Sequence, residues 1–133
     1  MLYFEDLKVG DSRVSGSHEL REEEIIAFAR QWDPQPWHVD REAAARSPMG
    51  GLTASSCHTY SVAALLLSRM EPIAGIASLK HEFELPSPAR PGDVLSLKVT
   101  FADKRPSESK ADRGLVTVDS VLMNQAGEVV LRL

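Results

Sequence analysis

The chain has 133 residues, of which 43% are hydrophobic and 26% are charged, and its net charge is -4 at pH 7. The length predicts one domain, residues 1–133, with a real hydrophobic core, and the composition is that of a folded soluble protein. The negative charge argues against a nucleic-acid-binding surface, which needs clustered lysine and arginine in excess.

The first part of the chain predicts one strand followed by helices. Residues 12–18 have the mixed pattern of a short strand. From Arg21, three glutamates favour the start of a helix, and apolar residues recur at helical spacing as far as Trp32. The two prolines of "DPQP" end this helix and predict a stiff loop. Asp40 is the expected cap of a short helix in "VDREAAARS".

Residues 53–70 predict the central helix. Their side chains are apolar on nearly every face, which is typical of a helix enclosed by the rest of the fold. The glycine-rich stretch "SPMGG" separates this helix from the one before it.

After Pro72 the hydrophobic period changes to two, which predicts strands over residues 76–85, 94–102, 115–124 and 128–133. The last alternation continues up to Leu133, so we expect this strand to extend further. Helices followed by a run of strands are the α+β pattern. We therefore expect a long central helix wrapped by a curved antiparallel β-sheet.

The cellular location follows from what the chain lacks. With one cysteine, Cys57, no disulfide can form within the chain, and the N-terminus shows no basic and apolar signal segment. The longest apolar run, Val62 to Leu67, is far shorter than the ~20 residues that cross a bilayer. These features predict a cytoplasmic protein without a membrane partner.

The segment "WDPQPWHVD", residues 32–40, holds an acid and a histidine five positions apart. On a helix Asp33 and His38 would point to different faces, but a loop fixed by two prolines lets them converge. A carboxylate and an imidazole that share one water can take a proton from it and return a proton elsewhere. The imidazole suits this use because its unperturbed pKa is about 6.5. The structural alternative is that Asp33 caps the next turn and His38 is a packed loop histidine.

A second candidate feature is "GGLTASSCHT", residues 50–59, which leads a glycine-rich turn into the N-terminus of the central helix. Unpaired backbone N–H groups and the helix dipole attract negative charge there, so an oxyanion could be held. The alternative is an ordinary glycine turn whose helix is capped by Ser55 or Ser56.

The stretch "FARQWDPQPWHVDREAA", with "GGLTASSCHT" after it, resembles the MaoC-like dehydratases, also called R-specific enoyl-CoA hydratases, which have the hot-dog fold. The resemblance covers nearly the whole chain. It implies that Asp33 and His38 hold a catalytic water, which adds to a trans-2-enoyl thioester to give a 3-hydroxyacyl thioester, or leaves in the reverse reaction of fatty acid metabolism. It also implies that the backbone N–H of Ser56 polarises the thioester carbonyl.

Two departures from the family pattern concern the substrate. Gln35 takes the place of a family asparagine, and Ser56 takes the place of a glycine and could narrow the acyl pocket. Gly51 and Ser55 are expected to support the site or bind substrate. The resemblance implies a coenzyme A thioester as the substrate, with no metal or organic cofactor.

The other chemically capable residues have plainer interpretations. His58 is expected to be a packed, hydrogen-bonded histidine, and His18 and His81 are expected on strands at the surface. Cys57 is interpreted as a small buried hydrophobic residue, and no metal-ligand spacing is present. Five basic residues are either contacts for coenzyme A phosphates or solvated: Arg90, Lys104, Arg105, Lys110 and Arg113.

A sheet with one unpaired edge strand favours two-fold assembly. We therefore expect a homodimer, or a dimer of dimers or trimer of dimers, and the resemblance places the acyl channel along the dimer interface. Two other functions remain open. A hot-dog thioesterase would direct water at the thioester carbonyl, and a non-catalytic acyl-thioester-binding domain would bind without turnover. The pairing of Asp33 with His38 argues for hydration.

Overall fold

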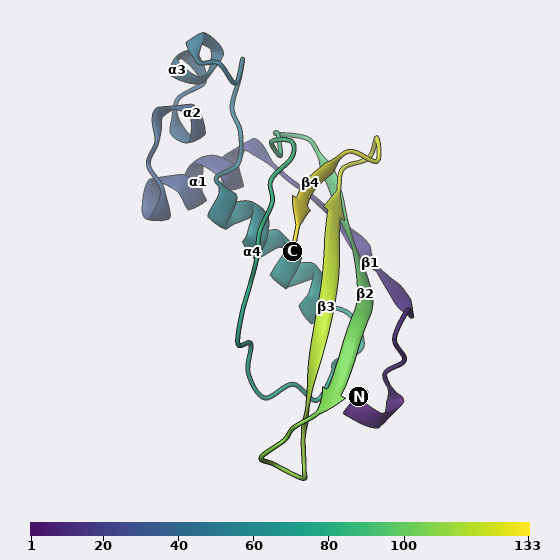
Figure 1. Ribbon diagram of the computed structural model, residues 1–133. Helices are drawn as coiled ribbons and strands as arrows, with labels where there is room; N and C mark the ends of the chain where they lie inside the picture. Colours follow the sequence, from purple (N-terminus) through teal and green to yellow (C-terminus); the bar gives the residue numbers. More distant parts are fainter.

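The computed structural model describes residues 1–133, and Figure 1 shows how they are arranged. In chain order the elements are the 3-10 helix η1 (Phe4–Asp6), β1 (Ser12–Glu19), α1 (Glu22–Trp32), α2 (Pro36–Val39), α3 (Arg41–Arg46), α4 (Ser56–Ser68), β2 (Val94–Pro106), β3 (Gly114–Met123) and β4 (Val129–Arg132). The strands form one antiparallel sheet in the order β1-β2-β3-β4. The helix α4 lies along one side of this sheet, and α1, α2 and α3 gather at one end of it (Figure 1).

The core lies between β2 and α4. Leu95, Leu97 and Val99 of β2 are fully buried, while the residues between them are at least partly exposed. These side chains belong to one hydrophobic cluster with Val62 and Leu66 of α4. The predicted α+β class, with a central helix against an antiparallel sheet, is confirmed.

The strand predicted over residues 76–85 is wrong for the isolated chain. The segment contains no strand, and a single antiparallel bridge joins Glu84 to Arg132 at the end of β4. A strand needs a neighbour along its length, and β4 has only 4 residues to offer. The segment's other edge has no neighbour in this chain, so it stays extended but unpaired.

The predicted central helix was too long, and it is less enclosed than its composition suggested. Residues 53–55 do not join the helix, because Ser55 caps it and α4 begins at Ser56. One face is buried, but Leu65 and Leu67 on the other face are 37% and 42% exposed. Cys57 is also exposed, so its interpretation as a buried residue was wrong. No helix combines the length and the hydrophobicity that a membrane crossing requires.

The stiff loop predicted after Trp32 contains a short helix. Pro36 stands at the first position of α2, where its missing N–H costs nothing and its fixed φ suits the turn. Asp40 then caps α3, as predicted, by accepting hydrogen bonds from the N–H groups of Glu42 and Ala43.

Candidate active site

Local backbone hydrogen bonds bring Asp33 and His38 together. Asp33 ends α1, where its N–H donates to the carbonyl of Ala29 at 2.8 Å. Gln35 links the two residues through its backbone. Its N–H donates to the carbonyl of Asp33 at 2.8 Å, and its own carbonyl accepts from the N–H of His38 at 2.9 Å. The backbone between Asp33 and His38 therefore folds back on itself, which brings the two side chains together.

The imidazole of His38 is held in one tautomer. Its Nδ1 lies 2.6 Å from the carbonyl oxygen of Thr53, which can only accept, so Nδ1 carries the proton. The unprotonated Nε2 faces Oδ2 of Asp33 at 3.6 Å. The histidine is buried and the aspartate side chain is 27% exposed. Two acceptors at this distance form no hydrogen bond with each other, but one water can donate a proton to each.

The same residue, Thr53, ties this pair of side chains to the start of α4. The N–H of Thr53 donates to the carbonyl of Trp37 at 3.3 Å, next to the bond that its own carbonyl makes with His38. The ring of Trp37 meets the imidazole edge-on, with ring centroids 6.0 Å apart. The pair Asp33 and His38, called the dyad below, is therefore connected to the head of α4 through Thr53.

The first turn of α4 leaves backbone donors free. Ser55 is fully buried and caps the helix, with its Oγ accepting from the N–H of His58 at 3.2 Å. The N–H groups of Ser56 and Cys57 have no acceptor in the chain, because residues 52–53 lie outside the helix and the carbonyl of Thr53 is directed at His38. Two unpaired donors at the positive end of a 13-residue helix can bind a developing negative charge.

The turn before α4 depends on glycine. Gly50 and Gly51 have φ values of 69° and 157°, which residues other than glycine rarely adopt. Arg90 lies against this turn, and its Nη2 donates to the carbonyl of Met49 at 2.7 Å. Arg90 forms no ion pair, so its positive charge is uncompensated beside the head of α4.

The two departures from the family pattern take different positions. The side chain of Gln35 is exposed and gives α2 no capping bond, so the link between the dyad residues runs through its backbone. Ser56 is the first residue of α4 and is exposed, so its side chain projects from the helix start.

The remaining predicted residues divide by location. His81 is exposed as expected but belongs to no strand, whereas His18 on β1 is half-buried and donates to Glu24. Arg105 and Arg113 pair with acidic neighbours in the β2–β3 loop. Figure 1 places that loop at the end of the molecule opposite α1, α2 and α3, far from the dyad of the same chain.

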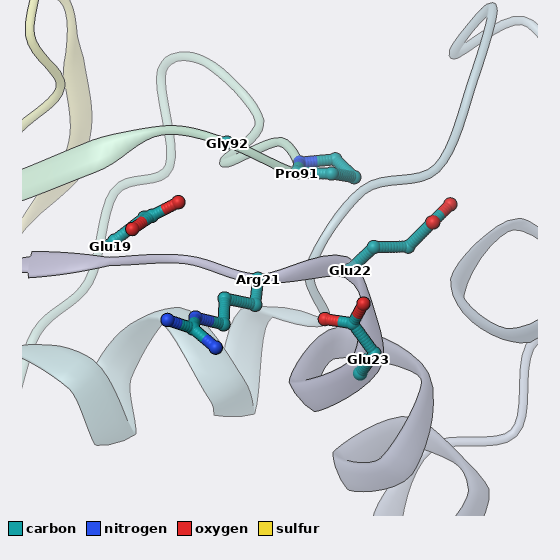
Figure 2. Close-up of a pocket in the computed structure, with 6 residues that line it drawn as sticks. All are labelled: Glu19, Arg21, Glu22, Glu23, Pro91 and Gly92. Atoms are coloured by element: carbon teal, nitrogen blue, oxygen red, sulfur yellow. The ribbon is translucent and has the colours of Figure 1, made fainter.

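A hollow at the junction of β1 and α1 is shown in Figure 2. None of its lining residues is hydrophobic: Glu19, Arg21, Glu22, Glu23, Pro91 and Gly92. A second hollow lies between residues 82–84 and the strands β3 and β4. Neither includes Asp33 or His38, and the acidic lining of the first does not suit an acyl chain or a phosphate.

Sequence reasoning missed two contributors. The carbonyl of Thr53 is a backbone group and has no signature in the sequence. Glu24 was counted only as one of three acids at a helix start, but its carboxylate contacts both His18 and His58. Burial lowers the pKa of His58, while the nearby charge of Glu24 partly opposes this shift.

Comparisons with known proteins concern the family and the fold of the chain. The family model of the MaoC like domain matches residues 8–122. A 3-hydroxybutyryl-CoA dehydratase of Methylorubrum extorquens AM1 is 30% identical over 112 residues, which are 84% of this chain and 71% of that protein.

Solved structures give the same result. The MaoC-like dehydratase from Rhodospirillum rubrum has a TM-score of 0.95 and 44% identity, and the match covers 99% of this chain and 92% of that chain. An unliganded R-hydratase from Pseudomonas aeruginosa has a TM-score of 0.78 at 22% identity, covering 96% and 79%, which concerns the fold alone. The chain therefore belongs to the MaoC-like dehydratase family of hydro-lyases and has its hot-dog fold.

Proposed function

We propose that residues 1–133 form one acyl-thioester hydratase domain, which adds water to a trans-2-enoyl-CoA or removes it from a 3-hydroxyacyl-CoA. The observation that carries the proposal is the pair of acceptors, Nε2 of His38 and Oδ2 of Asp33, held 3.6 Å apart. They are tied through Thr53 to a helix start with unpaired N–H groups. Coenzyme A belongs to the substrate, and the reaction uses no further cofactor.

The dyad acts on the water. Asp33 and His38 each accept one of its hydrogen bonds, which directs the oxygen lone pair at C3 of the enoyl group. As the oxygen bonds to C3, one water proton passes to the dyad and the π electrons move onto the thioester oxygen. The enolate then takes a proton at C2 from the protonated dyad, which returns to its starting state.

The head of α4 acts on the carbonyl. The N–H of Ser56 donates to the thioester oxygen as its negative charge grows, and the helix dipole adds to this stabilisation. Removal of one such donor typically costs 10²–10³-fold in rate in other enzymes, roughly, so this contact ranks beside the dyad. Arg90, unpaired beside the same turn, is the basic residue best situated to meet a phosphate of coenzyme A.

The test measures hydration of trans-2-enoyl-CoA thioesters of increasing length by loss of the conjugated enoyl absorbance. D33N and H38Q keep size but remove proton transfer, so each should lower the rate by roughly 10²–10⁴-fold. The double mutant should lose little more than either single mutant, because both changes disable the same water. D11N is the matched control, since Asp11 is an exposed aspartate far from the dyad in the chain.

Thermal unfolding of each variant separates lost chemistry from lost folding. Parent-like hydration by D33N and H38Q would overturn the proposal. Release of free thiol without hydration would instead favour the thioesterase, and thioester binding without turnover would favour a binding domain.

We further propose that the working unit is a homodimer, or a larger assembly of dimers. The extended segment 76–85 exposes Ile76 by 73%, Leu79 by 78% and Phe83 by 46%. It continues the sheet through the bridge from Glu84 to Arg132, and its outer edge has no partner. An extended, apolar and unpaired edge favours pairing with a second copy across a two-fold axis.

The apolar surface of this segment is continuous with that of α4. Tyr60 on α4 contacts the segment, with its hydroxyl 3.1 Å from Nδ1 of His81 and its ring 4.9 Å from that of Phe83. Leu65 and Leu67 are exposed further along α4. A second copy would cover both surfaces and supply an apolar wall for the acyl chain.

A further inference from the structure

The carboxylate of Glu24 joins three elements close to the proposed site. Its Oε1 accepts from Nε2 of His18 on β1 at 2.8 Å and from the backbone N–H of Arg21 at 3.0 Å. Its Oε2 faces Nε2 of His58 on α4 at 3.7 Å. The first turn of α1 is thereby connected to the end of β1 and to the first turn of α4.

The imidazole of His58 has contacts on its ring face as well as at its Nε2 edge. The imidazole is 5% exposed and stacks on Phe28, with ring centroids 4.6 Å apart and planes inclined by 9°. Glu24 and Phe28 are four residues apart on α1, so they project from the same side of that helix. α1 therefore contacts the imidazole through a carboxylate and an aromatic ring together.

The contacts define the proton positions. A carboxylate only accepts, so the nitrogens that face Glu24, Nε2 of His18 and Nε2 of His58, carry protons. Nδ1 of His58 is then unprotonated, and it is buried without any hydrogen-bond partner. A proton added there would be an unsatisfied buried donor, which is costly.

The pKa of His58 reflects this environment. Burial is the main cause that lowers the pKa of His58, and the charge of His18 lowers it further. The negative charge of Glu24, whose Oε2 lies 3.7 Å from Nε2 of His58, opposes the shift. These two groups, Glu24 on α1 and His18 on β1, are the titratable side chains that face the imidazole from the elements packed against it. His58 is accordingly neutral at neutral pH.

The two helices that meet at His58 each have one terminus in the proposed site: the start of α4 and the end of α1. On α4, Ser56 precedes His58 by two residues, and the N–H of His58 is bound to the Oγ of Ser55. On α1, Phe28 is followed by Ala29, whose carbonyl binds the N–H of Asp33. A shift of the imidazole along Phe28 would therefore change the separation between the dyad and the N–H groups of α4.

We propose that His58 is a positioning residue. Its neutral imidazole, in contact with Glu24 and Phe28, fixes the distance between Asp33 and the amide of Ser56. When the imidazole is protonated, these contacts loosen and the distance is no longer fixed. The proposal rests on the proposed function of Asp33 and Ser56. In this proposal the reaction rate depends on the protonation of a second group, His58, which lies outside the dyad. In this role His58 acts on Asp33 and Ser56 through the two helices.

The kinetic test compares H58F, which can keep the stack on Phe28, and E24Q, which keeps the shape of Glu24. Both should lower kcat by roughly tenfold or more with little change in KM, because misplacement by about 1 Å can cost 10²-fold in rate. E24Q should also shift the acid limb of the kcat profile to lower pH, because Glu24 is what raises the pKa of His58. H58F should lack the His58 contribution to that limb. E23Q, an exposed neighbour on the same turn, is the matched control.

A second measurement uses the parent protein alone and does not depend on enzymatic activity or on the folding of any variant. In the parent protein, the amide signals of Ser56 and Asp33 in heteronuclear NMR should move with the same midpoint as the ring protons of His58. Amide signals that stay fixed through the titration of His58 would overturn the positioning role. Parent-like kcat and pH profiles in stable H58F and E24Q would overturn it too. A parent protein without hydratase activity would contradict the proposed function alone, because the NMR titration would still decide the role of His58.

Discussion

Nδ1 of His38 donates to the carbonyl oxygen of Thr53 across 2.6 Å, and this one bond bears on both parts of the proposed site. It turns the unprotonated Nε2 of His38 toward Asp33, and it is made by a carbonyl that is directed at the imidazole rather than at the N–H of Cys57. The pair Asp33 and His38 and the free amides at the head of α4 are therefore connected through Thr53.

The first prediction concerns the tautomer of His38. Because a carbonyl only accepts, we expect neutral His38 to carry its proton on Nδ1. Long-range nitrogen–proton correlation spectra of labelled protein would identify the protonated nitrogen, and H38Q would assign the signals. A ring protonated on Nε2 would leave Asp33 as the only acceptor for the water and contradict the proposed shared role.

The second prediction concerns the cap of α4. S55A removes the oxygen that accepts from the N–H of His58 and should cost about 1 kcal/mol of stability, as other cap deletions do. For a chain of this size the melting temperature should fall by roughly 3–5 °C, and kcat should fall because the Ser56 amide loses its support. Calorimetry and hydration kinetics measure the two effects. S55T, which keeps the oxygen, is the control, and an unchanged S55A would show that the cap carries neither.

The third prediction concerns acyl selectivity. Ser56 is exposed at the start of α4, and S56G removes its side chain while keeping the amide. We expect kcat/KM for longer acyl chains to rise relative to the four-carbon substrate by about tenfold, the lower end of what one methylene-sized change is worth. The same ratio for S56A should lie between those of the parent and S56G. A ratio that does not change in either variant would place the acyl chain elsewhere.

The fourth prediction concerns assembly. Leu79 is 78% exposed in the single chain, so L79E should leave the fold intact but dissociate the proposed dimer. Sedimentation at micromolar concentration should report a dimer or larger for the parent and a monomer for L79E, with hydration lost in the monomer. V9E is the control, because Val9 is 56% exposed outside the segment 76–85. A monomeric parent that is fully active would contradict the shared site.

The fifth prediction concerns stability and pH. Burial lowers the pKa of His58 in the folded state, whereas in the unfolded chain this histidine takes up its proton near pH 6.5, approximately. The unfolded state therefore binds more protons between these two pKa values. The contribution of His58 to stability is complete above about 6.5 and is lost as pH falls below it. The melting temperature of the parent should thus fall relative to that of H58F on acidification. A difference that stays constant with pH would show that His58 does not titrate as inferred.

Much of the fold could be predicted because periodicity reports burial directly. The alternation of Leu95, Leu97 and Val99 indicated which face of β2 is buried, and Asp40 was identifiable as a cap from its place before a helical run. Asp33 and His38 were singled out for the same kind of reason, since two prolines between them forbid a continuous helix.

Other features depend on partners that a pattern cannot show. Residues 76–85 alternate like a strand, but a strand exists only where a neighbour supplies hydrogen bonds, and β4 reaches only Glu84. The apolar outer face of α4 resembles a buried face in composition, although Leu65 and Leu67 are exposed in the single chain. The bond from His38 to Thr53 involves a backbone carbonyl, which every residue has.

The late start of α4 has a consequence for anyone who engineers this protein. An α-helix wound three residues further back would pair the amide of Ser56 with the carbonyl of Leu52, and that of Cys57 with the carbonyl of Thr53. The carbonyl of Thr53 would then point along the helix axis rather than at Nδ1 of His38. Helix-favouring substitutions at residues 52–55 are thus a route to higher thermal stability that would disrupt the proposed active site. Residues that look like the weakest part of the helix should be left alone when the rest of the chain is optimised.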